Sequence, residues 1–139
     1  MAISQVLCTS FKKELLEATH NFGSHGFKIA LYTDAATLNA DTTVYSTDNE
    51  VSGTGYSAGG EVITATTVSS GDGVGFVNFS NATWASSSFT ARGALIYNTS
   101  ANNKALMTLN FGDNKTSNNS TFTVAMPADT STTALIRIT

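Results

Sequence analysis

The two histidines, His20 and His25, are the residues whose chemistry best suits metal binding or proton transfer. A zinc pair on a helix needs its ligands about one turn apart on the same face. Gly23 and Gly26 interrupt the helix around these positions, so the spacing does not fit. The sequence therefore predicts no metal site here and favours a solvated helix end.

A group of loop carboxylates makes calcium the next chemistry to consider. Asp48, Glu50 and nearby backbone carbonyls would supply the oxygen ligands that calcium prefers. The regular Asp-x-Asp-x-Asp-Gly spacing is absent, however, and acidic side chains commonly cap turns. We therefore expect no bound metal at these carboxylates.

The glycine-rich run 53–60 and the single cysteine also lack chemical partners. Phosphate-binding loops present their amides at the start of a helix, whereas residues 61–68 have the Thr- and Val-rich pattern of a strand. Cys8 has no histidine in register and is expected to be a small buried apolar side chain. The sequence thus predicts no catalytic residue, no cofactor and no enzymatic activity.

Aromatic side chains leave one binding function open. Trp84, Tyr45, Tyr56 and Tyr97 would suit a sugar-stacking platform, but core or interface packing is the other reading of such residues.

The composition excludes several partners. Charged residues make up 12% of the 139 residues, and the net charge is −3. No basic run is present to neutralise phosphates, so no nucleic-acid partner is expected. No apolar run reaches the roughly 20 residues of a membrane span, and the first residues lack the pattern of a signal peptide. We expect synthesis in a host cytoplasm and no contact with membrane.

The hydrophobic pattern predicts one domain over residues 1–139, beginning with an extended arm at 1–9. Apolar residues at 11, 15, 18 and 22 predict an amphipathic helix over 10–22, with Ser10 as its N-cap. Residues 27–139 follow with the period of two that is typical of strands.

The β-rich part reads as seven or eight short strands separated by turn residues. The segments with alternating apolar and polar residues are 27–33, 61–68, 74–79, 83–89, 91–98, 104–111, 121–126 and 133–138, with turns expected at 70–73, 100–103 and 112–114. Residues 94–97 are apolar on both faces, so a central position is expected. The sequence predicts a mainly β fold, a single antiparallel β-sandwich of Ig-like or jelly-roll type with one short N-terminal α-helix.

Residues 34–60 are too long for an ordinary connection. We expect one short strand near 43–47 and otherwise an ordered flap that lies over the sheet or over a neighbouring subunit. Apolar residues placed in the arm, helix and flap are the candidate protein-contact residues: Ile3, Val6, Leu7, Phe11, Leu15, Phe22, Val44, Tyr45 and Tyr56.

Four segments carry a resemblance to a known group of proteins. They are FKKELL at 11–16, FKIALYT at 27–33, NEVSGTGYSAGG at 49–60 and ARGALIYN at 91–98. In these segments the chain resembles small virion structural proteins of tailed bacteriophages, including cyanophages.

The resemblance implies a non-enzymatic virion structural protein, and capsid cement (decoration) is the role it favours. The implied partners are the major capsid protein and further copies of the chain, with a homotrimer favoured, and the implied location is the capsid surface of the virion. The alternative is a tail, neck, baseplate or fibre component that binds a virion protein or a host-surface glycan.

Overall fold

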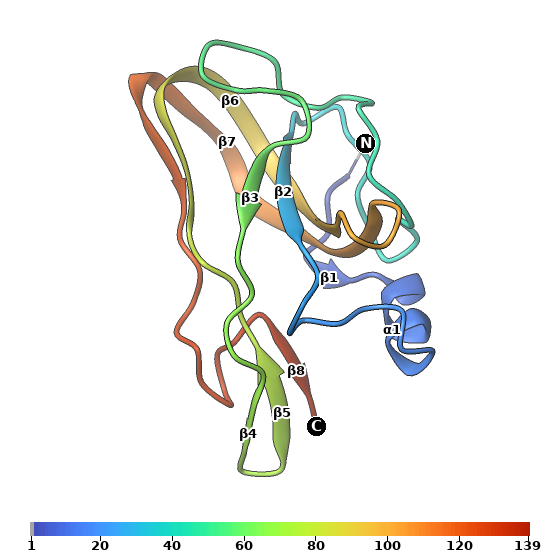
Figure 1. Cartoon of the computed structure of the whole chain (residues 1–139). Helices are drawn as coiled ribbons and strands as arrows, with labels where there is room; N and C mark the ends of the chain where they lie inside the picture. The colour runs from blue at the N-terminus through green and yellow to red at the C-terminus, as the bar shows by residue number, and fades with distance from the viewer. Residues whose placement is uncertain (1) are drawn as a thin grey trace.

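The computed structural model describes residues 2–139, which form one helix and eight strands in two antiparallel sheets (Figure 1). The larger sheet has the order β1-β7-β6-β2-β3, and the smaller one has the order β4-β5-β8. The strands are β1 (Val6–Leu7), β2 (Phe27–Tyr32), β3 (Glu61–Ile63), β4 (Ser69–Gly71), β5 (Val74–Val77), β6 (Ala82–Asn98), β7 (Lys104–Val124) and β8 (Ile136–Ile138). The predicted class is confirmed: the chain is mainly β, with an arrangement consistent with a β-sandwich and one short helix.

Strands β6 and β7 form one long hairpin that dominates the molecule (Figure 1). The sequence predicted four strands here, with a turn at 112–114, and that turn is wrong. Ala91 pairs with Lys115 and Gly93 pairs with Asn110, so residues 111–114 of β7 lie opposite Arg92 alone. Such a bulge bends a ribbon without ending it, and the turn-like residues serve this bend.

Two predicted strands are much shorter in the structure. Residues 61–68 keep regular pairing only in β3, after which Ala65 makes an isolated bridge to Phe79. Residues 133–138 form a strand only in β8.

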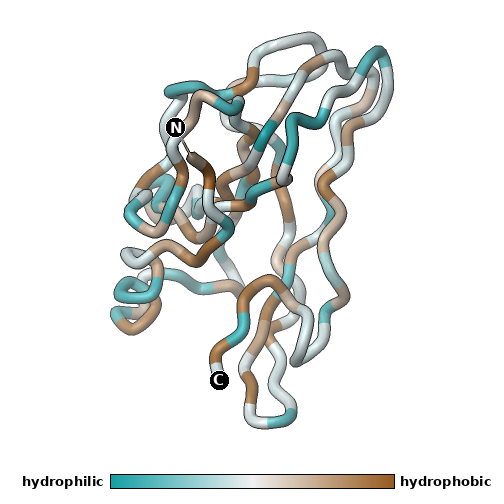
Figure 2. The backbone as a smooth tube through the Cα atoms, turned by 180° about the vertical axis from the view of Figure 1, so that it is seen from behind, coloured by the Kyte–Doolittle hydropathy of each residue, from teal (hydrophilic) through white to brown (hydrophobic). Residues whose placement is uncertain are grey.

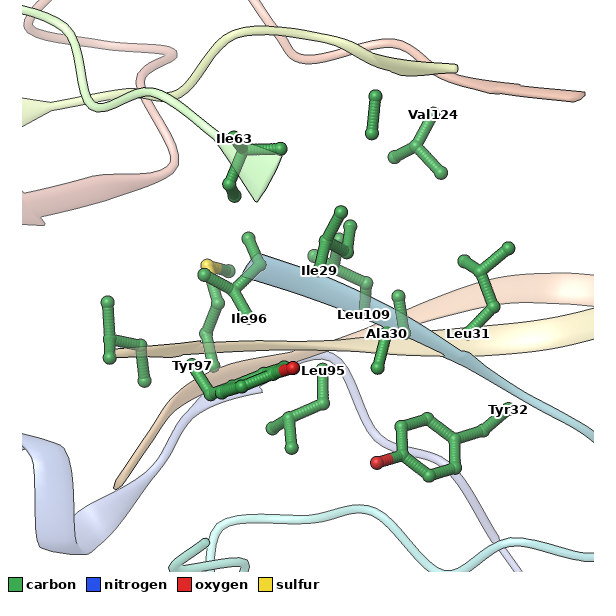
Figure 3. Packing of buried hydrophobic residues seen from close by; sticks show 14 of the residues in the cluster. Ile29, Ala30, Leu31, Tyr32, Ile63, Leu95, Ile96, Tyr97, Leu109 and Val124 are labelled. Atoms are coloured by element: carbon green, nitrogen blue, oxygen red, sulfur yellow. The ribbon is translucent and has the colours of Figure 1, made fainter. Parts of the chain in front are cut away.

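The core lies on both faces of β2 and of the C-terminal half of β6. Figure 3 shows Ile29 and Ile96 pointing to one side of the ribbons, and Leu95 and Tyr97 pointing to the other. Leu95 and Ile96 are both fully buried, and β6 lies between β7 and β2. The predicted central position of residues 94–97 is therefore confirmed.

The flap, residues 34–60, covers the second face of this sheet. Leu38 and Val51 are buried within it, and the Val51 N–H donates to the Leu31 carbonyl at 2.9 Å. The strand expected near 43–47 is wrong, because only an isolated bridge joins Val44 to Lys104. Of the two positions expected for the flap, it occupies the one over its own sheet.

Glycine lets the flap approach β2 closely. At Gly60, with φ of 84°, an added Cβ would lie 1.8 Å from the carbonyl oxygen of Ile29. Glycine thus serves backbone-to-backbone packing here rather than the binding of a ligand.

The helix α1 is shorter than predicted and spans Thr9–Leu16. Cys8 is its N-cap, while the hydroxyl of Ser10, the expected cap, is buried without a partner. At the other end Ala18 has φ of 62°, and the Thr19 N–H donates to the Glu14 carbonyl at 2.9 Å. This is a Schellman ending, so the apolar stripe stops there, although glycine is the usual residue at this position.

The N-terminal arm is part of the sheet. Val6 and Leu7 pair with Thr108 and Met107 of β7, and the following Cys8 is fully buried. The arm predicted at residues 1–9 is thus joined to the sheet through β1 and ends at Cys8, because Thr9 begins the helix, while Met1 lies outside the described residues. Unpaired backbone groups are costly once buried, which favours this pairing.

Candidate protein-contact site

The Glu50 carboxylate links several parts of the flap by hydrogen bonds. It accepts hydrogen bonds from the Tyr45 hydroxyl at 2.6 Å, from the Gly59 N–H at 2.8 Å and from the Tyr56 hydroxyl. Tyr97 adds a bond from its hydroxyl to the Gly59 carbonyl at 2.6 Å, and its ring stacks on that of Tyr45. The acidic residue considered for calcium thus has its oxygens occupied by donors of its own chain.

Burial in this cluster changes the acidity of the tyrosines. Two effects raise the pKa of Tyr97 to about 12: the loss of hydration on burial, which is the larger, and the negative charge of Glu50. Burial and the hydrogen bond to Glu50 raise the pKa of Tyr45 and Tyr56 well above their usual range. Both effects disfavour the charged phenolate, so these hydroxyls stay protonated donors.

The two histidines meet through one asparagine. The Asn98 amide nitrogen lies 2.9 Å from His20 Nδ1 and 3.0 Å from His25 Nδ1, while its oxygen accepts from the Ser100 N–H. His20 Nε2 lies 2.9 Å from the Glu14 carboxylate. His20 is 6% exposed, so the solvated helix end predicted for it is wrong.

This cluster ties the helix and the loop after it to the β6–β7 turn. Every polar atom just described has a partner within the fold, as buried polar groups require. Among residues 2–139, no three His, Cys, Asp or Glu side chains gather as a metal site would need.

The aromatic residues considered for sugar stacking face inward. Trp84 and Tyr97 are each 2% exposed. Tyr56 lies between the flap and the ring of Trp84, with 6.1 Å between the ring centroids. A glycan platform built on Trp84 is therefore wrong, and these rings form part of the core.

Cys8 is also enclosed. Burial, followed by the charge of Glu14, raises the pKa of its thiol to about 11, which disfavours the reactive thiolate.

The outer edge of β7 is the feature that remains open. Strand β1 pairs only with Met107 and Thr108, and within residues 2–139 no other strand pairs with β7 on the side away from β6. From Leu109 to Val124 that edge therefore presents a ladder of main-chain groups without a strand partner. The ribbon forms one border of the molecule in Figure 1, and Figure 2 shows hydrophobic and polar residues interspersed along it.

The other sheet edges differ from this one. Strand β1 is an edge of only two residues. Strands β3, β4 and β8 are three residues long, and each of these three carries or adjoins a charge at Glu61, Asp72 or Arg137. Short, charged edges are how proteins prevent strand-to-strand association. Residues 116–128 carry no charged side chain. Asp113, Lys115 and the bulge at 111–114 protect the first part of the β7 edge, so the part that lacks the usual protection is residues 116–124, apart from the irregular pairing around Asn119.

An apolar groove runs along the same edge. Its volume is about 650 Å³, and its walls include Leu109, Phe111, Phe122, Val124, Met126 and Leu135, with Gln5, Lys115 and Thr123 as its polar members. A second hollow of about 400 Å³ adjoins it and shares Gln5, Pro127 and Leu135 with the first. The groove and the unpaired edge together are what we call the β7 site.

The residues predicted for protein contact lie mostly elsewhere. Phe11 is 1% exposed, so a contact role for it in the folded chain is wrong. Val44 is 48% exposed and remains available. Val6 is partly buried, and the others are partly buried and pack against the chain's own core: Ile3, Leu7, Leu15, Phe22, Tyr45 and Tyr56. Of these, Val6 and Leu7 line the smaller hollow.

Sequence reasoning missed the β7 site although its signal was present. Phe122, Val124 and Met126 alternate with Thr121 and Thr123, which predicted the strand correctly. The missing step was the absence of charge over 116–128, which distinguishes an edge open to pairing from a protected one.

Comparisons with known proteins identify no similar protein. No protein-family model, no curated protein and no solved structure matches the chain. Over residues 2–139, no helix combines the length and the apolar character needed to cross a membrane.

Proposed function

We propose that the chain is a non-enzymatic structural protein of a phage virion that acts through protein–protein contacts, with capsid cement as its role. The observation that carries the contact role is the β7 site, where an edge without a strand partner, uncharged over residues 116–124, lies beside a mainly apolar groove. Open edges and exposed apolar surface mark places where another chain binds.

The groups that could serve catalysis support the same proposal. Glu50 is engaged by tyrosines, His20 by Glu14 and Asn98, and Cys8 is buried with a raised thiol pKa. Each is committed to holding the fold together, whereas a catalytic group needs access to a substrate.

The virion setting and the major capsid protein as partner depend on the resemblance of the segments 11–16, 27–33, 49–60 and 91–98. A cement protein joins neighbouring subunits of a shell, and a surface able to add a strand suits that task.

The experiment is a count of this chain in purified particles by quantitative mass spectrometry. We expect a repetitive location on the shell, with copies on the order of hundreds per particle, as the symmetry of a capsid requires. Very few copies would indicate the tail, neck or baseplate alternative. Absence from particles would contradict the virion proposal altogether.

A further inference from the structure

We propose that the β7 edge pairs with the same edge of a second copy, joining two chains by antiparallel strand addition around a two-fold axis. This goes beyond the proposed function, because it identifies the surface and the occupant and does not depend on a virion. It differs from the homotrimer that the resemblance favoured.

The main-chain groups determine the kind of occupant. A strand edge without a partner is completed by an extended backbone, which satisfies its N–H and C=O groups in register. The regular part of this edge is residues 120–124, because Asn119 has φ of 50° and interrupts the strand just before it. Here Thr121 and Thr123 face solvent, while Phe122 and Val124 face inward.

The distribution of charge favours a second copy over an unrelated strand. In a two-fold antiparallel pairing, residues equally far on either side of the axis lie opposite each other, so a charge close to the axis would lie near the same charge of the second copy. Residues 116–128 have none. Lys115 precedes this segment and Asp129 follows it, and antiparallel pairing brings the Lys115 end of one copy toward the Asp129 end of the other.

The groove supplies the apolar area that strand pairing alone lacks. Stable interfaces bury about 1,600 Å² in total, which exceeds what a short ladder of backbone bonds covers. A strand added beside β7 extends this layer, so the inward-facing Phe122 and Val124 of the second copy come to lie over the open groove. The exposed parts of Met126 and Leu135 are then covered as well.

The test measures the oligomeric state of the full chain by analytical ultracentrifugation over a range of concentrations. We expect a dimer whose population rises with concentration. Thr121→Lys/Thr123→Lys should reduce dimerisation at least tenfold, and so should Thr121→Glu/Thr123→Glu, because like charges then face each other across the seam. A mixture of the two variants should dimerise again, since opposite charges then meet.

A matched control carries the same charges one strand away. Thr83 pairs with Thr123 inside the hairpin, and Thr83 and Ala85 are both exposed, so Thr83→Lys/Ala85→Lys should leave most of the dimer intact. Circular dichroism and thermal unfolding of the monomeric variants check that they remain folded.

A second measurement locates the seam directly. The only native cysteine is buried, so Thr121→Cys or Thr123→Cys introduces one accessible thiol. Mild oxidation of a mixture of the Thr121→Cys and Thr123→Cys variants should link copies, because these positions lie opposite each other about an axis near Phe122, whereas oxidation of Thr83→Cys should not. A chain that is monomeric at every concentration, a trimer, or a dimer indifferent to both charge pairs would overturn the pairing. None of these results bears on the particle count that tests the proposed function.

Discussion

The flap and the β7 edge are two irregular parts of this molecule with opposite chemistry. In the flap, residues 34–60, polar groups find partners inside the chain, with Glu50 receiving three donors and Tyr97 bonding to Gly59. Along β7, from Leu109 to Val124, the outer main-chain groups find no strand within residues 2–139. The polar groups of the long loop are satisfied within the chain, whereas the outer edge of the strand is left without a strand partner.

The difference teaches that length and irregularity are poor guides to a contact surface. A long loop without structure invites a functional reading, since many such loops bind partners. Here the loop is needed to cover Leu95 and Tyr32 on the second face of the sheet, both of which are buried. The surface left for another chain is a strand, whose edge repeats the same backbone groups that built the sheet.

The largest loss of stability is expected from a substitution in the core beneath the flap. Leu95→Ala should lower the free energy of unfolding by about 2–5 kcal/mol, because it removes fully buried apolar atoms and leaves a cavity. That is a large fraction of a typical total of about 5–15 kcal/mol. Urea unfolding followed by tryptophan fluorescence measures the change. A loss below about 1 kcal/mol would mean that the flap does not seal this face.

The next largest loss of stability is expected from the hydrogen bonds that hold the flap on the sheet. Glu50→Ala should cost about 2–4 kcal/mol, because the donors from Tyr45, Tyr56 and Gly59 lose their acceptor in a partly buried place. Asp48→Ala is the control in the same loop: it is exposed and should change stability by less than about 0.5 kcal/mol. Equal losses for the two variants in urea unfolding would contradict the central role given to Glu50.

The features that could be predicted from the sequence are those encoded by neighbouring residues. Alternation identified β2, the continuous apolar run 94–97 identified the central strand, and the stripe beginning at Phe11 located the helix. The end of that helix depended on Ala18 adopting a left-handed conformation, which its residue type does not favour. Local pattern alone could not place it.

The candidate site was harder to predict because it depends on contacts across the chain. The strand partner of the arm could not be predicted, because Met107–Thr108 lies some hundred residues later in the chain. Residues 112–114 looked like a turn because glycine and asparagine serve both turns and bulges. An open edge is defined by a strand that is missing, so it is recognised only after all other strands have been placed.

A pH dependence sharpens the contrast between the closed and the open region. The pKa of Tyr97 is raised to about 12 from its usual 10.0, and those of Tyr45 and Tyr56 are raised in the same direction. Stability should hold up to about pH 9 and fall as the pH rises toward 12, because the unfolded chain releases tyrosyl protons that the folded chain retains.

Urea midpoints measured across this alkaline range test the expectation. Tyr97→Phe should flatten the decline, since one of the retained protons is gone, although it also loses the bond to Gly59. Unchanged stability up to pH 11 in the native chain would show that these hydroxyls ionise as freely as exposed ones do.

The smallest change in unfolding free energy is expected for substitutions on the β7 edge of the monomer. Thr121→Ala and Thr123→Ala remove exposed side chains without hydrogen bonds to the rest of the fold, so each should change the unfolding free energy by less than about 0.5 kcal/mol at low protein concentration. At high concentration the native chain should become more stable, because a partner that binds only the folded state adds to stability by mass action. The variants with two lysines should lack that increase. A loss comparable to that of Glu50→Ala at low concentration would mean that this edge already serves the fold of one chain, and the contrast with the flap would disappear.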